Sequence, residues 1–435
     1  MAQPDPSELL LRVRDTVVNT LNRLPRYMCT QTIDRSQYEP DPPAVDVKAC
    51  NDRRPEDPEP KLVRTNADRV RLDVGIAERG EIYSWVGENR FGNQSLFQIV
   101  NEGSVSTGYF EGFLELVFRG DNASFSYSGE ISEGGRSLME YGYRVPLEAS
   151  HYVFRFPGQS VTTAYEGTLL VDPQTAELVR LTLRTDGMPP ETGACEVNNT
   201  MNYNRFRLNG SDFLLPLETR LHIKGRNGVE MENLTVYSGC HEFLGESTLN
   251  FDTPPDAPAP KSTTSRPETV IPAGLPFRLA LTDNIHVATA AAGETVKAVL
   301  TADLRDQAKT VLIQRGTPVI CRILRIRRWY GHGTDARALD PNGQIRLPPN
   351  YSVRVELLLR LEDFALPGGQ QPVYAQPDRV GIASLPRPGT LKSRPMELGP
   401  LNAMGRNQWS VNFLRAGDDY VIKSGLASNW VTVAQ

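Results

Sequence analysis

Turn-forming sequences recur along the first half of the chain at intervals of a few strand lengths, and this spacing constrains the fold more than any other feature. They stand at residues 133–135 (Glu-Gly-Gly), 172–175 (Asp-Pro-Gln-Thr), 209–211 (Asn-Gly-Ser) and 225–228 (Gly-Arg-Asn-Gly). The segments between them, such as residues 152–156 (Tyr-Val-Phe-Arg-Phe), are short and rich in aromatic and β-branched residues, as strands are. Because a short turn joins strands that are neighbours in a sheet, the pattern predicts an antiparallel meander in a mainly β fold.

An amphipathic helix is predicted ahead of these strands. Asp5 can cap its N-terminus, and Pro6 suits its first position. Apolar residues then recur at helical spacing, at Leu10, Val13, Val17, Leu21 and Leu24. A single apolar stripe with charged residues opposite it indicates a helix that covers a sheet.

A curved sheet of about nine to eleven strands needs its concave face covered. The N-terminal helix and two short helices expected at residues 97–100 and 113–118 are the helical material available for this. We therefore predict an α+β first domain. It is a curved antiparallel half-barrel with an N-terminal helix, short lid helices and an apolar hollow between sheet and helices.

The predicted hollow would be lined by apolar side chains from the helix, the lid segment and a facing strand. The candidates are Leu10, Val13, Val17, Leu21, Trp85, Phe113, Leu114 and Phe118. Periodicity leaves a second interpretation open, in which the same side chains fill a packed core and leave no space for a ligand.

A proline-rich stretch at residues 253–272 divides the chain. It holds six prolines with serine and threonine between them, and too little apolar matter to fold, so we expect a semi-stiff linker. The boundaries are then a first domain at 1–252, the linker, and a second domain at 273–435. For the second domain we predict a small β-barrel, a loosely ordered tail at 379–406 and a terminal hairpin.

Four of the five cysteines lie in the first domain, at Cys29, Cys50, Cys195 and Cys240, each near a strand end or in a loop. Disulfides there would indicate an exported protein, periplasmic or beyond. Cys29–Cys50 with Cys195–Cys240 is the economical pairing, although four cysteines allow three connectivities and a reduced cytosolic protein is the alternative. The fifth, Cys321, lies in an apolar run and is expected to be a buried, inert thiol.

The start of the chain bears on the same question. Residues 1–5 (Met-Ala-Gln-Pro-Asp) contain neither the basic nor the apolar region of a signal peptide. They fit the start of a mature exported chain behind an added methionine, and a short cytosolic start would look the same.

One concentrated basic and aromatic patch lies in the second domain. Its residues are Arg322, Arg325, Arg327, Arg328 and Trp329. Such a patch could bind an anionic partner, for example lipid phosphate or an acidic protein surface. The alternative is a solvated strand edge whose charges discourage aggregation.

No motif of a catalytic or cofactor site is found, so we predict a protein that is not an enzyme and has neither a cofactor nor a metal. The chain contains no G-x-S-x-G elbow and no phosphate-binding glycine loop, and no two of its five histidines lie within four residues. The 47 basic and 52 acidic residues give a net charge of −5, which argues against general nucleic-acid binding. No apolar run is long enough to form a membrane helix.

The first domain resembles the carriers that move lipoproteins across the periplasm (the LolA/LolB type). The residues that carry the resemblance are the amphipathic helix, the meander and the hairpin at 171–181 (Val-Asp-Pro-Gln-Thr-Ala-Glu-Leu-Val-Arg-Leu). It covers about residues 5–252 and implies an open barrel with a helical lid, whose hollow accepts acyl chains.

Two further resemblances concern the whole chain and the second domain. Residues 24–32, 106–108, 209–216 and 237–240 are similar to segments of a group of exported bacterial proteins of uncharacterised function. Residues 292–298 and 311–319 look like parts of the β-barrel modules of envelope-spanning secretion scaffolds, which implies assembly rather than chemistry.

These features predict a non-catalytic cell-envelope protein that binds a lipid or a lipidated partner in the hollow of its first domain. The alternative is a structural or assembly module that docks an envelope partner through the second barrel and uses no ligand cavity. An unrecognised hydrolase is the third hypothesis, and no nucleophile or acid–base group supports it.

Overall fold

The computed structural model describes residues 4–41, 60–77, 80–88, 91–92, 94–119, 122–208, 210–242, 271–330, 352–378, 396–398, 406–414 and 418–434. The chain divides into two compact units, residues 1–244 and 245–435, and each is described by itself. Residues 253–270 of the predicted linker, the expected loop that carries Cys50 and most of the tail at 379–406 lie outside the described residues.

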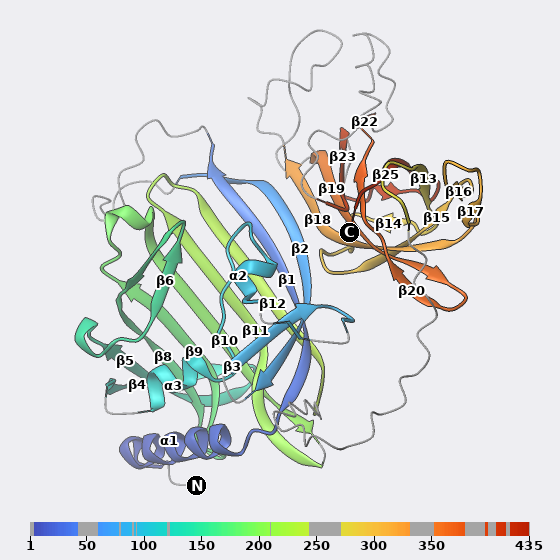
Figure 1. Ribbon diagram of the computed structural model, residues 1–435. Coiled ribbons are helices and arrows are strands. Elements are labelled where there is room, and N and C mark those ends of the chain that lie inside the picture. The colour runs from blue at the N-terminus through green and yellow to red at the C-terminus, as the bar shows by residue number, and fades with distance from the viewer. Residues whose placement is uncertain are drawn as a thin grey trace. The chain divides into compact units, whose positions relative to one another are not determined.

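The first unit is built on one open, curved antiparallel sheet (Figure 1). Its strand order is β3-β2-β1-β12-β11-β10-β9-β8-β5-β4. The strands are β1 (Tyr27–Pro40), β2 (Leu62–Ala77), β3 (Gly80–Trp85), β4 (Ser124–Glu133), β5 (Arg136–Val145), β8 (Ala164–Asp172), β9 (Glu177–Asp186), β10 (Ala194–Leu208), β11 (Ser211–Gly225) and β12 (Glu230–Glu242). The predicted meander is therefore present from β4 to β12, and the last strand returns to pair with the first.

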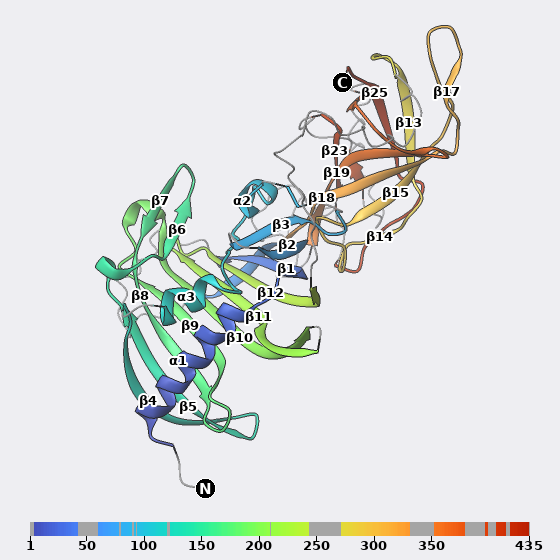
Figure 2. The ribbon, with the colours of Figure 1, turned by 60° about the horizontal axis from the view of Figure 1, so that its bottom comes forward.

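One expected member of the meander lies outside the sheet. β6 (Val153–Phe156) pairs only with β7 (Gln159–Thr162) among the described strands, and the two form a separate hairpin. Figures 1 and 2 show this hairpin on the same face of the sheet as the three helices α1 (Pro6–Arg23), α2 (Leu96–Ile99) and α3 (Gly112–Phe118). Two short 3-10 helices, Leu147–Ala149 and Pro190–Thr192, lie in the connections.

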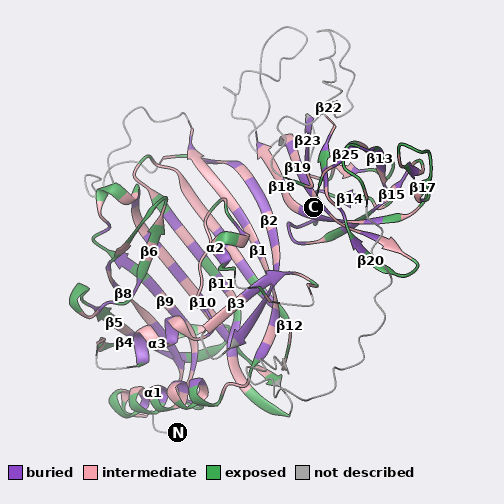
Figure 3. Ribbon diagram, in the orientation of Figure 1, coloured by how far each residue is buried: buried purple, intermediate pink, exposed green. Residues whose placement is uncertain are grey.

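Strict alternation separates the two faces of the sheet, and Figure 3 shows the resulting change of burial from residue to residue along the strands. The strand register places one row of side chains across the inner face, the one the helices cover. In strand order from β5 to β2 the row is Tyr143, Gly167, Leu183, Asn199, Leu221, Asn233, Arg35 and Asp68. Residues one position away point to the outer face.

Helix α1 lies across the sheet with one buried stripe. The Asp5 carboxylate caps it by accepting hydrogen bonds from the backbone N–H groups of Ser7 (2.8 Å) and Glu8 (3.2 Å). Its buried residues are Leu9, Val13, Val17 and Leu21, a spacing of four that keeps one face. Leu10, which the periodicity placed in the stripe, is only half-buried because it lies about 100° away around the helix.

Two tyrosines of the sheet fasten the helices to it. The Tyr141 hydroxyl donates to the Pro6 carbonyl at 2.8 Å, and the Tyr165 hydroxyl donates to the Leu116 carbonyl of α3 at 2.9 Å. Among the described residues, no helix is both long enough and apolar enough to cross a membrane.

A disulfide joins the first strand to the last at Cys29 and Cys240, which are 211 residues apart in the sequence. The β1–β12 register shifts between Met28 and Thr30, and Gly239 takes a φ of +61° at this bulge. The expected Cys29–Cys50 and Cys195–Cys240 pairing is therefore wrong, because strand pairing brings together cysteines that are remote in sequence. Cys195 is also disulfide-bonded.

The second unit is again antiparallel β. Its main strand order is β22-β23-β19-β18-β15-β13-β25-β21, with β20 beside β19 and the small pairs β14–β24 and β16–β17. The strands are β13 (Pro276–Leu281), β14 (Ile285–His286), β15 (Thr295–Leu300), β16 (Leu304–Arg305), β17 (Val311–Ile313), β18 (Pro318–Tyr330), β19 (Ser352–Leu366), β20 (Gly369–Pro372), β21 (Ala375–Pro377), β22 (Met396–Leu398), β23 (Gln408–Leu414), β24 (Val421–Ile422) and β25 (Ala427–Thr432). The small barrel stays a prediction.

Two expectations for this unit have a clear outcome. The terminal hairpin is wrong, since β23 pairs with β19 and β22 whereas β25 pairs with β13 and β21. Cys321 is a buried free thiol in the core, as expected, and burial raises its pKa to about 12.

The backbone pairing between β8 and β9 is interrupted at one place, where a side chain of the inner face reaches the backbone. The register passes from Glu166–Arg184 to Leu169–Leu181, and the intervening Thr182 carbonyl accepts a 2.7 Å hydrogen bond from the Tyr143 hydroxyl. That arrangement requires a glycine at position 167, because a Cβ there would lie 1.9 Å from the Thr182 carbonyl oxygen.

We expect the Gly167→Ala variant to lose at least about 2 kcal/mol of unfolding free energy, because the added methyl must displace backbone. Urea unfolding of the first unit measures this. Gly142→Ala, at the neighbouring strand, is the matched control, since its Cβ would meet only the side-chain hydroxyls of Ser126 at 3.3 Å and Ser128 at 3.6 Å. Equal stability of the two variants would contradict the close approach.

Removing the disulfide by the double change Cys29→Ala and Cys240→Ala should lower the unfolding free energy of the first unit by about 2–5 kcal/mol, because the bond closes a long loop. Denaturant unfolding without reductant checks the loss. The single variant Cys321→Ala, which lies in the other unit, should leave this transition in place. An unchanged midpoint in the double variant would mean that strand pairing alone holds β1 to β12.

Candidate functional site

An apolar floor lies on the inner face where β10, β11 and β12 run side by side. Val197, Ile223 and Met231 are direct register partners across these three strands, so their side chains meet on one face. Leu221 lies two residues before Ile223 on the same face. Val197, Leu221 and Ile223 are buried in a small cluster, against which Phe154 and Met231 pack.

The walls above this floor come from elements outside the sheet. The β6–β7 hairpin supplies Phe154 and Phe156, whose rings stack at 6.4 Å. Helix α3 supplies Phe113 and Leu116 on the other side. The hollow is partly open to solvent and has a volume of about 820 Å³, within the range of about 300–1,000 Å³ that is usual for small-molecule sites.

Residues 102–110, which we call the strap, cross the hollow and are tied to the sheet. Arg35 forms a two-pronged, buried ion pair with Asp68, with both N–O distances 2.7 Å, and its Nη1 donates to the Glu102 carbonyl at 2.6 Å. Gly103 has a φ of +76°, and a Cβ there would lie 2.7 Å from the same Nη1. The guanidinium therefore passes directly beneath the strap, where a side chain does not fit.

Two more anchors hold the strap. The Asn233 amide donates to the Ser104 carbonyl at 2.8 Å and accepts from the Ser104 hydroxyl at 3.2 Å. The Glu81 carboxylate accepts hydrogen bonds from the backbone N–H groups of Gly108 (2.6 Å) and Phe110 (3.0 Å). Charge-assisted bonds of this kind make the strap a fixed wall of the hollow.

Tyr152 lines the hollow, and its hydroxyl bonds to Asn199, a buried residue outside the lining. Asn199 accepts from the Tyr109 hydroxyl at 3.0 Å and donates to the Tyr152 hydroxyl at 3.2 Å. Desolvation by burial raises the pKa of Tyr152 to about 12, so this lining group carries no charge at neutral pH. The interior thus combines apolar walls with satisfied, uncharged polar atoms, which suits a ligand with an apolar body.

Charged side chains occur at the rim. Glu115 and Arg119 of the α3 segment form an exposed ion pair at 3.4 Å, and Arg119 also donates to the Asn22 side chain at 3.3 Å. Arg155 of the hairpin lies over the Phe97 ring, with 5.2 Å between the guanidinium carbon and the ring centroid. His151 is a further ionisable residue of the lining.

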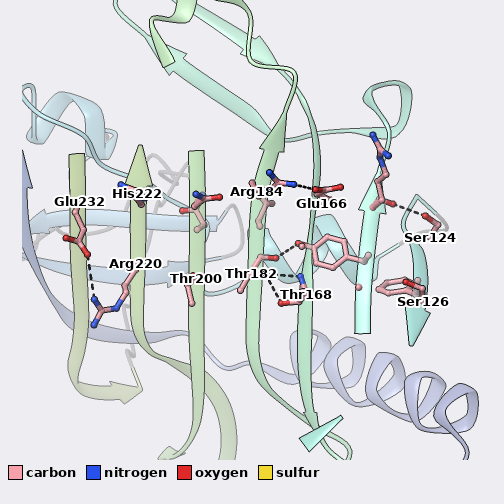
Figure 4. Close-up of a pocket in the computed structure, with 18 residues that line it drawn as sticks. Ser124, Ser126, Glu166, Thr168, Thr182, Arg184, Thr200, Arg220, His222 and Glu232 are labelled. Atoms are coloured by element: carbon pink, nitrogen blue, oxygen red, sulfur yellow. Dashed lines mark hydrogen bonds and ion pairs between the residues drawn. The ribbon is translucent and has the colours of Figure 1, made fainter. Parts of the chain in front are cut away.

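A second hollow, of about 1,000 Å³, lies on the outer face of the same sheet (Figure 4). Side chains of opposite charge line it, including Glu166 and Arg184, which are register partners and form an ion pair, and Arg220 and Glu232, which lie 3.7 Å apart on adjacent strands. Between them lie hydroxyls such as those of Thr168 and Thr182, 2.9 Å apart. Because its charges are matched within the sheet and its lining is polar, this surface does not suit an apolar ligand.

The predicted hollow-lining residues do not all meet at the inner hollow. Phe113 lines it. The helix residues Val13, Val17 and Leu21, the α3 residues Leu114 and Phe118, and Trp85 of β3 are buried elsewhere in the core, and Leu10 is half-buried. A ligand-binding role for these residues stays a prediction.

Sequence reasoning missed the floor and the hairpin. The alternation of Phe154 and Phe156 is visible in the sequence, but it predicts a strand of the main sheet as readily as a separate hairpin. The partnership of Val197, Ile223 and Met231 depends on strand register, for which the sequence offers no local signal.

At least three of the four arginines of the basic patch form ion pairs within the second unit. Arg322 pairs with Glu362 at 2.6 Å, Arg325 with Glu356 at 2.9 Å and Arg328 with Asp418 at 3.4 Å. The Arg327 guanidinium carbon lies 5.5 Å from the ring centroid of Trp329. Anion binding at this patch stays a prediction.

The chain matches no family model, and no curated protein matches it either. Solved structures with some likeness include a DUF1329 family protein from Desulfovibrio piger, with a TM-score of 0.27 and 10% identity over 57% of this chain and 98% of that one. A putative outer membrane lipoprotein-sorting protein domain from Vibrio parahaemolyticus has a TM-score of 0.27 and 8% identity over 54% and 92% of the two chains. Lipoprotein LppX from Mycobacterium tuberculosis has a TM-score of 0.19 and 10% identity over 55% and 99%. Likenesses this low carry no argument, so the function is argued from the hollow itself.

The Asp68→Asn variant tests the anchor beneath the strap. It leaves the buried Arg35 charge without its carboxylate, so we expect a loss of about 3–5 kcal/mol in unfolding free energy and faster amide hydrogen exchange in residues 102–108. Asp34→Asn is the matched control, because the neighbouring Asp34–Arg69 pair is partly exposed and should be worth less than about 1 kcal/mol. Similar losses in both variants would show that the strap does not depend on the buried pair.

Proposed function

We propose that the first unit is a non-catalytic binding protein whose inner hollow takes an acyl chain, either of a free lipid or of a lipidated partner. The observation that carries the proposal is the hollow of about 820 Å³ between the floor of β10–β12, the hairpin and α3. Protein cores normally close to a density that leaves few voids larger than a water molecule. A space of this size with aromatic and aliphatic walls is the usual form of a site for an apolar ligand.

The chemistry of the lining favours a flexible apolar chain over a polar metabolite. Polar metabolites are oriented by several converging charged or unpaired polar groups. Here polar groups of the lining are already bonded, the Tyr152 hydroxyl to Asn199 and Ser104 to Asn233. Transfer of apolar surface into such a space supplies about 25 cal/mol per Å² without requiring new polar contacts.

The disulfide supports an exported, cell-envelope location. Disulfides such as Cys29–Cys240 persist in oxidising compartments and are rare in the cytosol. An envelope location also supplies the ligand class, since acyl chains are abundant there. Docking of an envelope partner by the second unit remains the alternative role for that half of the chain.

Uptake of a fluorescent fatty-acyl probe by delipidated full-length protein tests the proposal. We expect saturable binding to the wild type and at least a tenfold loss in the Met231→Trp variant, because the indole would occupy the floor of the hollow. Val236→Trp on the same strand is the matched control, since Val236 is 40% exposed. A wild-type protein that binds no acyl probe, or equal binding by both variants, would overturn the proposal.

A further inference from the structure

The charges at the rim of the inner hollow are unbalanced. Glu115 and Arg119 neutralise each other as an i,i+4 pair 3.4 Å apart. Arg155 has no carboxylate partner among the residues that the structure describes, and its one contact of note is with the Phe97 ring at 5.2 Å. Throughout the outer face, by contrast, arginines such as Arg144, Arg180 and Arg184 form ion pairs.

The positive charge of Arg155 lies next to the apolar lining of the hollow. It lies between Phe154 and Phe156 on β6, and all three residues line the hollow. Its guanidinium reaches across to Phe97 of α2, so it spans the rim between the hairpin and the helix. A ligand whose tail lies against the walls would therefore leave its head beside an exposed guanidinium.

We infer that the hollow selects amphiphiles with an anionic head, a carboxylate or a phosphate, and that Arg155 binds this head while the tail occupies the apolar interior. The inference rests on the proposed acyl-binding function and specifies its ligand class. Guanidinium binds both carboxylate and phosphate through two parallel hydrogen bonds, so the two sources share one chemistry. An arginine held only by an exposed ring contact can turn to an anion at little cost.

The charge of the remaining lining favours the same ligand class. Glu115 is the carboxylate of the lining, and Arg119 screens it. The inner polar groups are neutral. A cationic head would thus meet the unpaired positive charge of Arg155, and an anionic head would meet no unpaired negative charge in the lining.

Three probes with the same tail test the inference: dodecanoate, dodecyl phosphate and dodecanol, each below its aggregation concentration at about pH 8. For the wild type we expect both anions to bind about fivefold more tightly than the alcohol, which is the upper end for an exposed ion pair. The Arg155→Gln variant should lose this preference and keep its affinity for dodecanol, which shows that the hollow is intact. Arg155→Lys should retain most of the preference.

Arg144→Gln is the matched control, because it removes one positive charge from an exposed site on the outer face, and it should bind all three probes as the wild type does. Raising the salt concentration should weaken the preference for the anions in the wild type and leave Arg155→Gln unchanged. If only one of the two anions is preferred, that result identifies the head group of the ligand as a carboxylate or as a phosphate. Equal binding of all three probes by the wild type, or a preference that survives in Arg155→Gln, overturns the inference; failure of all three to bind overturns the proposed function instead.

Discussion

The pairing of the last strand with the first is the constraint on which the candidate site depends. β12 lies beside β1 in one register from Thr30 to Tyr38, and the Cys29–Cys240 disulfide lies at the bulge near one end of that ladder. The same register sets Asn233 beside Arg35, and Arg35 lies opposite Asp68 on the next strand. The anchors of the strap therefore occupy one row only because strands more than 190 residues apart in the sequence are neighbours in the sheet.

The row of anchors formed by Asn233, Arg35 and Asp68 accounts for the hollow. The part of the strap that lines the hollow is held by hydrogen bonds to Arg35, Asn233 and Glu81, whereas Phe110 at its end packs against the rings of Tyr27 and Tyr237. Polar anchors fix a backbone at a set distance, whereas apolar contacts would draw it down until the space closed. The β6–β7 hairpin, which pairs with no strand of the main sheet among the described residues, completes the wall on the other side.

The sequence predicted the architecture of the first unit better than its site. Local signals, namely the Asp5 cap, the four-residue spacing and the turns at 133–135 and 225–228, correspond to features of the structure because each depends on a few adjacent residues. The disulfide partners and the floor of the hollow depend on register between distant strands, which local patterns do not specify. The hairpin at 153–162 was misplaced for a related reason, since its alternation is the same in or out of a sheet.

An unfilled apolar space has a thermodynamic consequence for this unit. The rings of Phe154, Phe156 and Phe113 line a space that is partly open to solvent, so without a ligand they lack the apolar contacts that burial would give them. A ligand that binds only the folded state restores those contacts and stabilises it by about RT ln(1 + [L]/Kd). The strap is held by hydrogen bonds to the sheet and the hairpin by the packing of Phe154 against the floor, so the walls are in place before a ligand binds. The hollow is thus preorganised, so little of the binding free energy is lost to ordering the site.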